Sequence, residues 1–196
     1  MIAFSMAYSL QRHFSIILLT IMKYIALLRG VNAWSKNRVA MNTLKNIFEV
    51  SGYTHVRTYV NSGNVIFESD ETQEKLQNEI PKKLQNEFGF DIKTLIKNED
   101  EIIKIALSIP RSWKNDAEQR TDVAYLFSEV DWAKTRDELP INSEYIDVRY
   151  VKGALIWNVR RRDYHKSKLN AIIRSDAYQY MTVRNANTAR YLAGMK

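Results

Sequence analysis

The sequence contains no cysteine, and its 196 residues include three prolines and six glycines. The lack of cysteine excludes a disulfide framework, thiolate zinc sites, iron–sulfur clusters and thiol nucleophiles. Nothing in the composition requires an oxidising compartment, so we expect a cytoplasmic protein. Hydrophobic residues make up 45% of the chain and charged residues 26%, which is typical of a folded protein with a buried core.

Familiar signatures of enzymes are also missing. The sequence has no glycine-rich phosphate loop, no G-x-S-x-G nucleophile elbow and no H-E-x-x-H zinc motif. The histidines, His13, His55 and His165, are too scattered for a metal-ligand pattern, so we expect no metal site. The carboxylates show no spacing typical of a catalytic pair. The sequence therefore indicates no catalytic residue and no cofactor, and it leaves open whether the chain is an enzyme.

The formal charge of +7 is unevenly distributed. Residues 149–196 hold eleven Lys or Arg but only two acids, Asp163 and Asp176. A one-sided positive field attracts phosphates, acidic ligands or nucleic acid. The alternative is that these basic side chains only keep the protein surface solvated.

The first 21 residues differ from the rest of the chain, with one charged residue, Arg12, and an apolar run from Phe14 to Ile21. A secretory signal peptide is one interpretation. However, the run is interrupted by Lys23, has no A-x-A cleavage pattern and is too short to span a bilayer. We therefore interpret Met22 as the natural start and residues 1–21 as an N-terminal extension, and we expect no membrane partner.

From Met22 onward, the spacing of apolar residues alternates between the period of a strand and that of a helix. The first half predicts a strand at 23–29, a helix at 41–51, strands at 56–60 and 64–68, a helix at 72–88, a strand at 91–96 and a connecting helix at 98–108. The second half predicts a strand at 122–127, a short helix at 131–138, strands at 145–151 and 154–160, a helix at 167–174, a strand at 178–183 and a closing helix at 187–195. We expect Asp131 to cap the short helix.

Both halves follow the order strand-helix-strand-strand-helix-strand. This order predicts an α+β fold of two ferredoxin-like βαββαβ repeats, with antiparallel sheets and a C-terminal helix. The expected division is an extension at 1–21, a first repeat with the connecting helix at 22–109, and a second repeat at 110–196.

Small polar and cationic residues gather at the ends of the predicted strands, where side chains leave the sheet and can converge. Two of the cations lie beside predicted helix starts, whose backbone N–H groups attract negative charge. We therefore expect a small anionic ligand of the phosphate type to bind between the repeats. The candidate ligand-binding residues are Arg29, Asn32, Lys36, Ser62, Asn64, Lys168, Arg184 and Asn185.

A plainer interpretation of these residues stays open. Ser167, Asn185 and Asn187 are typical helix caps. The segment from Asn61 to Asn64 has the residues that a hairpin turn requires, because Gly63 tolerates positive φ.

Several of these segments match a known family pattern. An apolar strand runs into L-L-R-G-V-N at residues 27–32, and it is followed by Lys36-Asn37 and Met41. The pattern R-T-Y-x-x-S-G-N is matched in full by residues 57–64. Two further motifs of the pattern, S-K-L and T-x-R-N, are matched by residues 167–169 and 182–185. On these motifs, the chain from Met22 to the C-terminus resembles the uncharacterised bacterial proteins of the domain of unknown function 1697 family.

The resemblance implies an α+β fold with two ferredoxin-like repeats, and it implies no activity. The sequence departs from the family pattern at two places: Trp34-Ser35 stand where glycines are usual, and Ala186 stands where a tryptophan is usual. One hypothesis links both changes, with the Trp34 ring filling the space beside Ala186.

Two other functions are also consistent with the sequence. The first is a nucleic-acid-binding module that uses the basic C-terminal third, since ferredoxin-like sheets also stack RNA bases on exposed aromatics. The corresponding residues, Tyr125, Phe127 and Trp157, lie in apolar runs that favour burial instead. The second is a structural or interaction protein without a ligand site, whose polar motifs are all caps and turns.

Overall fold

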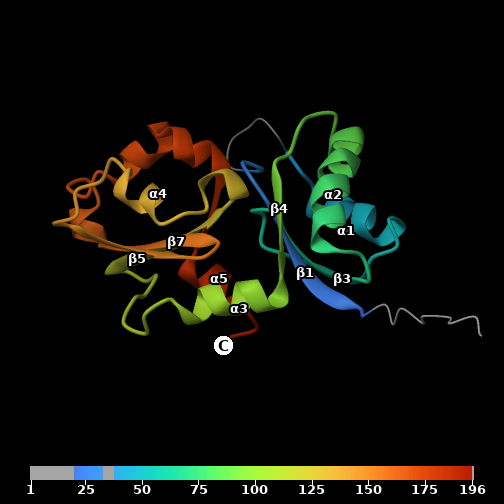
Figure 1. Ribbon diagram of the computed structural model, residues 1–196, viewed down its shortest axis with the longest axis horizontal. Coiled ribbons are helices and arrows are strands. Elements are labelled where there is room, and N and C mark those ends of the chain that lie inside the picture. Colours follow the sequence, from blue (N-terminus) through green and yellow to red (C-terminus); the bar gives the residue numbers. More distant parts are fainter. Residues whose placement is uncertain (1–19, 33–37, 196) are drawn as a thin grey trace, which may run out of the picture.

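The computed structural model describes residues 20–32 and 38–195, which form a mixed α+β structure with two four-stranded antiparallel sheets (Figure 1). The strands of the first sheet are β1 (Met22–Leu28), β2 (Thr54–Tyr59), β3 (Asn64–Ser69) and β4 (Thr94–Asn98). Those of the second sheet are β5 (Gln119–Leu126), β6 (Ile146–Val151), β7 (Ala154–Arg160) and β8 (Met181–Asn185). No helix of the described residues is long and apolar enough to cross a membrane.

Helical segments connect the strands. The α-helices are α1 (Met41–Val50), α2 (Gln73–Phe88), α3 (Glu99–Leu107), α4 (Lys134–Asp137) and α5 (Ala186–Leu192). The second half also has 3-10 helices, η1 (Ser128–Val130), η2 (Arg161–Asp163), η3 (Leu169–Arg174) and η4 (Asp176–Tyr180).

The first sheet has the strand order β2-β3-β1-β4, with β1 pairing antiparallel to both β3 and β4. Residues 24–28 of β1 are all buried, as expected for a strand that is covered on both faces. Helices α1 and α2 cover one face, where Phe48 and Ile80 pack against Phe67 and Ala26 of the sheet. Each sheet with the helical segments on its outer face is called a unit below, and edge strand β4 lies on the side of the first unit that faces the second (Figure 1).

The second sheet repeats this arrangement in the order β6-β7-β5-β8. Its outer face is covered mainly by 3-10 helices, where Leu169 and Ile172 of η3 pack near Leu155 and Trp157 of the sheet. The α-helix predicted at 167–174 is therefore wrong in type: residues 169–174 form η3. Lys168, with φ 55°, sits in the left-handed region immediately before it, which an α-helical residue does not adopt.

The cap predicted at Asp131 is also wrong, because the helix predicted at 131–138 is reduced to α4, which starts at Lys134 with Ala133 as its N-cap, and Asp131 lies between η1 and α4. Its carboxylate accepts hydrogen bonds from the Gly153 backbone N–H at 2.7 Å and the Tyr150 hydroxyl at 3.1 Å. Lys152 Nζ lies 2.8 Å away. Asp131 thus binds the β6–β7 hairpin to the segment between η1 and α4.

A shared apolar layer joins the two units. Helices α3 and α5 lie between the two sheets (Figure 1). Ile25 of the first sheet, Ile105 of α3, Ala189 of α5 and Tyr125 of the second sheet belong to one buried cluster. The face of the second sheet that carries Tyr125 is therefore covered. Trp157 on the opposite face is buried as well, as its apolar surroundings in the sequence indicate.

Candidate functional site

Arg184 on β8 lies at the junction of the two units and is only 6% exposed. Its Nε donates to Asn64 Oδ1 at 2.6 Å, and its Nη2 donates to the carbonyl oxygens of Leu28 at 2.7 Å and Ser62 at 2.8 Å. Its Nη1 donates to Thr182 Oγ1 at 2.9 Å and to the carbonyl of Val183 at 2.9 Å. All five N–H groups of the guanidinium thus have acceptors within the protein, so none is left for an anionic ligand.

Burial lowers the pKa of Arg184 to about 10, so the guanidinium stays protonated at neutral pH. The charge has no carboxylate partner among the described residues, and it is stabilised instead by a ring of carbonyl and amide oxygens. Hydrogen bonds to a charged group are roughly twice as strong as neutral ones. Arg184 is therefore a strong connection between the two sheets.

Asn64 is fully buried beside Arg184 and uses both ends of its amide. Its Nδ2 donates to the carbonyl of Tyr59 at 2.9 Å and to Ser62 Oγ at 3.1 Å, which closes the β2–β3 hairpin. Gly63 in this turn has φ 72°, and a Cβ there would lie 2.7 Å from atoms of both Leu28 and Val31. The turn therefore requires glycine for its conformation and for its close approach to β1.

Arg29 and Asn32 follow β1 at the same junction. Arg29 Nε donates to the carbonyl of Met181 at 3.0 Å, and its guanidinium lies 5.3 Å from the ring centre of Tyr178. Asn32 Nδ2 donates to the carbonyl oxygens of Val39 at 2.8 Å and Asn61 at 2.9 Å. Five candidates, Arg29, Asn32, Ser62, Asn64 and Arg184, are thus brought together, and much of their hydrogen bonding is directed at the protein itself.

The other candidates do not join this group. Lys168 is exposed and makes no hydrogen bond to those five residues in the described parts of the chain. Asn185 caps α5, with its Oδ1 accepting from the Thr188 N–H at 2.8 Å. Lys36 lies outside the described residues, and so does Trp34, whose proposed packing against Ala186 is therefore not described.

Asn187 and Ser167 were also expected to be helix caps, and neither occupies the N-cap position of a helix. Asn187 lies inside α5 and does not cap it, since its Nδ2 donates to the carbonyl of Asn115 at 3.2 Å. Ser167 lies one residue before the N-cap position of η3 and accepts from the Leu169 N–H at 3.3 Å.

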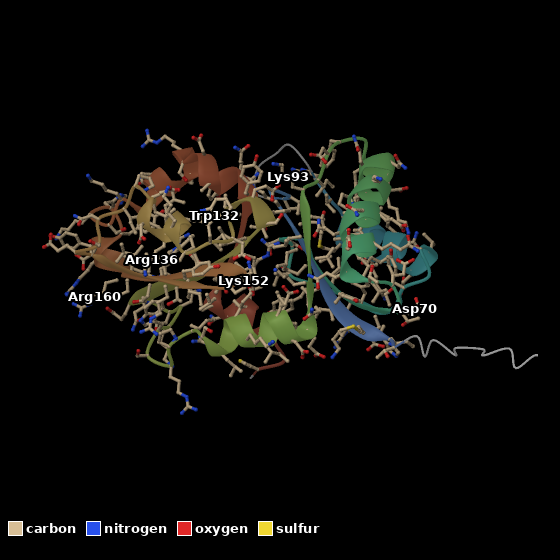
Figure 2. The ribbon with its side chains drawn as sticks, in the orientation of Figure 1. Asp70, Lys93, Trp132, Arg136, Lys152 and Arg160 are labelled. Atoms are coloured by element: carbon tan, nitrogen blue, oxygen red, sulfur yellow. The ribbon has the colours of Figure 1, made fainter. Side chains whose placement is uncertain are left out.

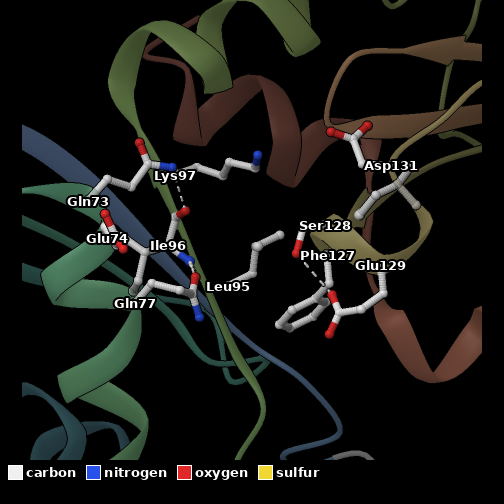
Figure 3. Close-up of a pocket in the computed structure, with 11 residues that line it drawn as sticks. Gln73, Glu74, Gln77, Leu95, Ile96, Lys97, Phe127, Ser128, Glu129 and Asp131 are labelled. Carbon is white, nitrogen blue, oxygen red and sulfur yellow. Dashed lines mark hydrogen bonds between the residues drawn. The ribbon is translucent and has the colours of Figure 1, made fainter.

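A cleft of about 520 Å³ lies between the two units, and none of the five candidates that gather around Arg184 is in its lining (Figure 3). One wall comes from α2 and β4 of the first unit, and the other from the end of β5 and the segment through η1. The cleft is lined by Gln73, Glu74, Gln77, Leu95, Ile96, Lys97, Leu126, Phe127, Ser128, Glu129 and Asp131. Sequence reasoning missed it, because no motif links two wall segments that are about 30 residues or more apart in the chain.

The cleft is acidic. Three carboxylates, Glu74, Glu129 and Asp131, line it against one ammonium group, that of Lys97. Lys97 is paired with Glu101 at 2.8 Å, and Asp131 with Lys152 at 2.8 Å. Glu74 on one wall and Glu129 on the other have no basic partner among the described residues. Burial alone would raise the pKa of Asp131, but hydrogen bonds from Lys152, the Gly153 N–H and Tyr150 outweigh it and hold that pKa below its ordinary value.

A depression of about 410 Å³ lies on the second unit and includes Arg160, Arg162, Glu118 and Asp147 in its lining. Figure 2 shows Arg160 at one end of the molecule, far from the first unit. Charges of both signs alternate there, so the basic C-terminal third does not form a continuous positive surface at this site. Among the described residues, no group of three or more His, Asp or Glu side chains is placed to hold a metal ion.

Comparisons with known proteins agree with the fold. The chain is similar to the conserved bacterial protein SP0830 from Streptococcus pneumoniae, with a TM-score of 0.78 and 22% sequence identity over 90% of this chain and 99% of that chain. No curated protein is significantly similar in sequence. The family model described as "Protein of unknown function (DUF1697)" matches residues 21–157, which include the hairpin motif at 57–64. The chain therefore belongs to the DUF1697 family, as the resemblance of its motifs predicted.

Proposed function

We propose that this protein binds a ligand in the acidic cleft between its two units, and that the ligand carries a positive charge. The observation behind this proposal is a pair of carboxylates, Glu74 and Glu129, that lie on the two walls of a cleft of about 520 Å³ and have no basic partner in the part of the chain that the structure describes. Clefts of roughly 300–1,000 Å³ are typical of small-molecule sites, in which a few polar groups fix the ligand's orientation.

The arrangement of the walls favours a cation over an anion. A positively charged group between the walls would approach Glu74 and Glu129 without competing for the two existing ion pairs, Lys97–Glu101 and Asp131–Lys152. An anion would face three carboxylates. Phe127, which is half-buried, supplies apolar surface that would hold the uncharged part of the ligand, whereas Leu95 and Leu126 of the lining are almost fully buried.

The anionic ligand expected from the sequence is less well supported. Its central cation, Arg184, has all its donors occupied by the protein, and Lys168 does not join the junction. Nucleic-acid binding through stacked aromatics is also disfavoured, because Tyr125 and Trp157 are buried. Anion binding would therefore depend on Arg29 and on the remaining exposed cations.

We also infer that each sheet with its helices is a ferredoxin-like unit, divided as 22–109 and 110–196. The strand order supports this: in each sheet the first and third strands in the chain lie at the centre, and helical segments follow the first and third strands. The shared apolar layer of α3 and α5 favours cooperative unfolding of the two units.

The test is a thermal-shift screen with two opposed sets of probes. The cationic set holds spermidine, arginine amide and a lysine-rich hexapeptide, and the anionic set holds phosphate, a nucleotide, a sugar phosphate and a short oligonucleotide. A ligand present at 100 times its Kd stabilises by about 2.7 kcal/mol, which for a chain of this size raises the Tm by roughly 5–10 °C. We expect hits in the cationic set.

Substitutions then locate the site. Glu74→Gln and Glu129→Gln are expected to reduce each cationic shift, whereas Glu118→Gln, the same charge change in the other depression, leaves it unchanged. Shifts that are equal in all three variants, or hits confined to the anionic set and abolished by Arg29→Gln, contradict the cleft as the site.

A further inference from the structure

Strand β4 forms an edge of the first sheet, and its outward backbone groups are occupied by side chains. Gln77 accepts from the Ile96 N–H at 2.8 Å through Oε1 and donates to the Thr94 carbonyl at 2.6 Å through Nε2. Gln73 Nε2 donates to the Ile96 carbonyl at 3.0 Å. Both glutamines belong to α2 and line the cleft, where Figure 3 shows them beside β4.

The side-chain amide of Gln77 makes the hydrogen bonds to β4 that a neighbouring strand would make. In a parallel pair, one residue of the added strand donates its N–H to the carbonyl of one edge residue and accepts, through its C=O, from the N–H two residues further along the edge. The amide of Gln77 offers the same two groups, to Ile96 and Thr94, and Gln73 adds a third bond. An extended peptide that lies in the cleft would therefore meet acceptors and a donor already arranged for a strand. Rotation of Gln77 and Gln73 would release them, and Gln73 would also leave Glu101 Oε2 and the Asn98 amide.

We propose that the cleft binds an extended basic peptide, which adds to β4 as a fifth strand in exchange for Gln77 and Gln73. This inference rests on the proposed function and names the class of partner. Recognition would combine two sources that are common in strand addition: main-chain hydrogen bonds give affinity, and side-chain contacts give specificity. The second source here is the acidic lining, with Glu74 on one wall and Glu129 on the other.

The alternative is that the glutamines only protect the edge. Natural sheets block exposed edge strands against pairing with a second copy. The two roles make different predictions once the glutamines are removed. Protection predicts that the chain pairs with itself through β4, whereas exchange predicts that the chain binds a peptide more tightly and remains monomeric.

The probe is an acetylated and amidated hexapeptide of alternating lysine and valine, used with its glutamate-valine counterpart. Two further versions carry N-methyl groups, one on the odd and one on the even residues, so that each blocks one edge of the extended peptide. Binding is measured by fluorescence anisotropy with the full chain. We expect the lysine peptide to bind, the glutamate peptide to bind at least tenfold more weakly, and one N-methyl version, but not the other, to lose at least tenfold in affinity.

Amide hydrogen exchange at Ile96 supplies a second readout. In Gln77→Ala the Ile96 amide is expected to exchange faster, because it loses its acceptor, and the lysine peptide is expected to restore protection and to bind at least threefold more tightly than to the original chain. Gln85→Ala, an exposed glutamine on the same helix, is the matched control and should change neither value.

The outcomes separate the two proposals. If both N-methyl versions bind like the parent peptide, strand addition is wrong, while a cleft that binds cations survives. If neither the hexapeptide nor any other cationic probe binds, both proposals are wrong. Dimers of the Gln73→Ala, Gln77→Ala double variant that bind no peptide would assign the glutamines to edge protection and overturn the exchange.

Discussion

Arg184 Nε donates to Asn64 Oδ1 over 2.6 Å, and this hydrogen bond joins β8 of the second sheet to β3 of the first, 120 residues apart in the sequence. The guanidinium is buried and also holds the carbonyl oxygens of Leu28 and Ser62. Through this contact, polar residues of the hairpin motif at 57–64 and of the T-x-R-N motif at 182–185 satisfy one another's hydrogen bonds across the junction.

Replacement of Arg184 by methionine is expected to destabilise the protein by about 2–4 kcal/mol, because Asn64 Oδ1 and the Ser62 carbonyl would lose their donor and the Leu28 carbonyl would keep only Thr182 Oγ1. Urea denaturation followed by circular dichroism measures this change. Arg174→Met, which removes an exposed arginine, should stay within about 0.5 kcal/mol. A loss equally small at Arg184 would show that the junction contributes little.

Gly63→Ala and Gly89→Ala form a matched pair, because both glycines have positive φ, 72° and 74°, but different surroundings. A Cβ at Gly63 would lie 2.7 Å from Leu28 and Val31, whereas a Cβ at Gly89 would meet nothing within 4 Å. We expect a cost of about 1 kcal/mol at Gly89 from the backbone alone. At Gly63 the overlap should raise the cost to roughly 2–4 kcal/mol. Equal unfolding midpoints for the two variants would contradict this account.

The Tyr125 hydroxyl is buried and, within the described residues, has no hydrogen-bond partner. Burial raises the pKa of Tyr125, so the phenol is neutral near pH 7. Tyr125→Phe is therefore expected to leave stability unchanged or to raise it by up to about 1 kcal/mol.

Tyr24→Phe is the comparison for Tyr125→Phe. Tyr24 is also buried, but its hydroxyl donates to the Glu71 carbonyl at 2.9 Å, so its removal should cost about 1 kcal/mol. Thermal unfolding of both variants measures the difference. A larger loss at Tyr125 than at Tyr24 would indicate a buried partner for the Tyr125 hydroxyl.

Asp131 gives stability a dependence on pH. Its folded-state pKa lies below the ordinary value of about 3.9. The stabilisation from its carboxylate is therefore present above the unfolded-state pKa and lost as the pH falls through the folded-state pKa. Asp131→Asn should cost about 1 kcal/mol at pH 7, and the difference from the original chain should shrink below about pH 4.

Urea midpoints at a series of pH values measure this difference for Asp131→Asn. Asp147→Asn, at an exposed position of β6, should show no such dependence. A difference between Asp131→Asn and the original chain that stays constant down to about pH 2 is the contrary result.

Local chemistry made several elements predictable from the residues. The apolar run of β1, the glycine turn at Gly63 and the Asn185 cap follow from local geometry, and each is present in the structure. Asp131 and Lys168 were misjudged, since the carboxylate is held by the Gly153 hairpin and the lysine adopts a left-handed conformation before a 3-10 helix. Both depend on how the second unit packs.

The sequence by itself determined the order of strands and helices, the turn chemistry and the family, because periodicity, capping and motifs are properties of neighbouring residues. Only the tertiary structure decided what the polar residues do. It placed Arg184 against Asn64, so that their hydrogen bonds are satisfied by the protein, and it set Glu74 opposite Glu129 across a cleft. Whether a polar group finds its hydrogen-bond partners, and which charges face each other, depends on distances between residues far apart in the chain. No local pattern in the sequence specifies these distances.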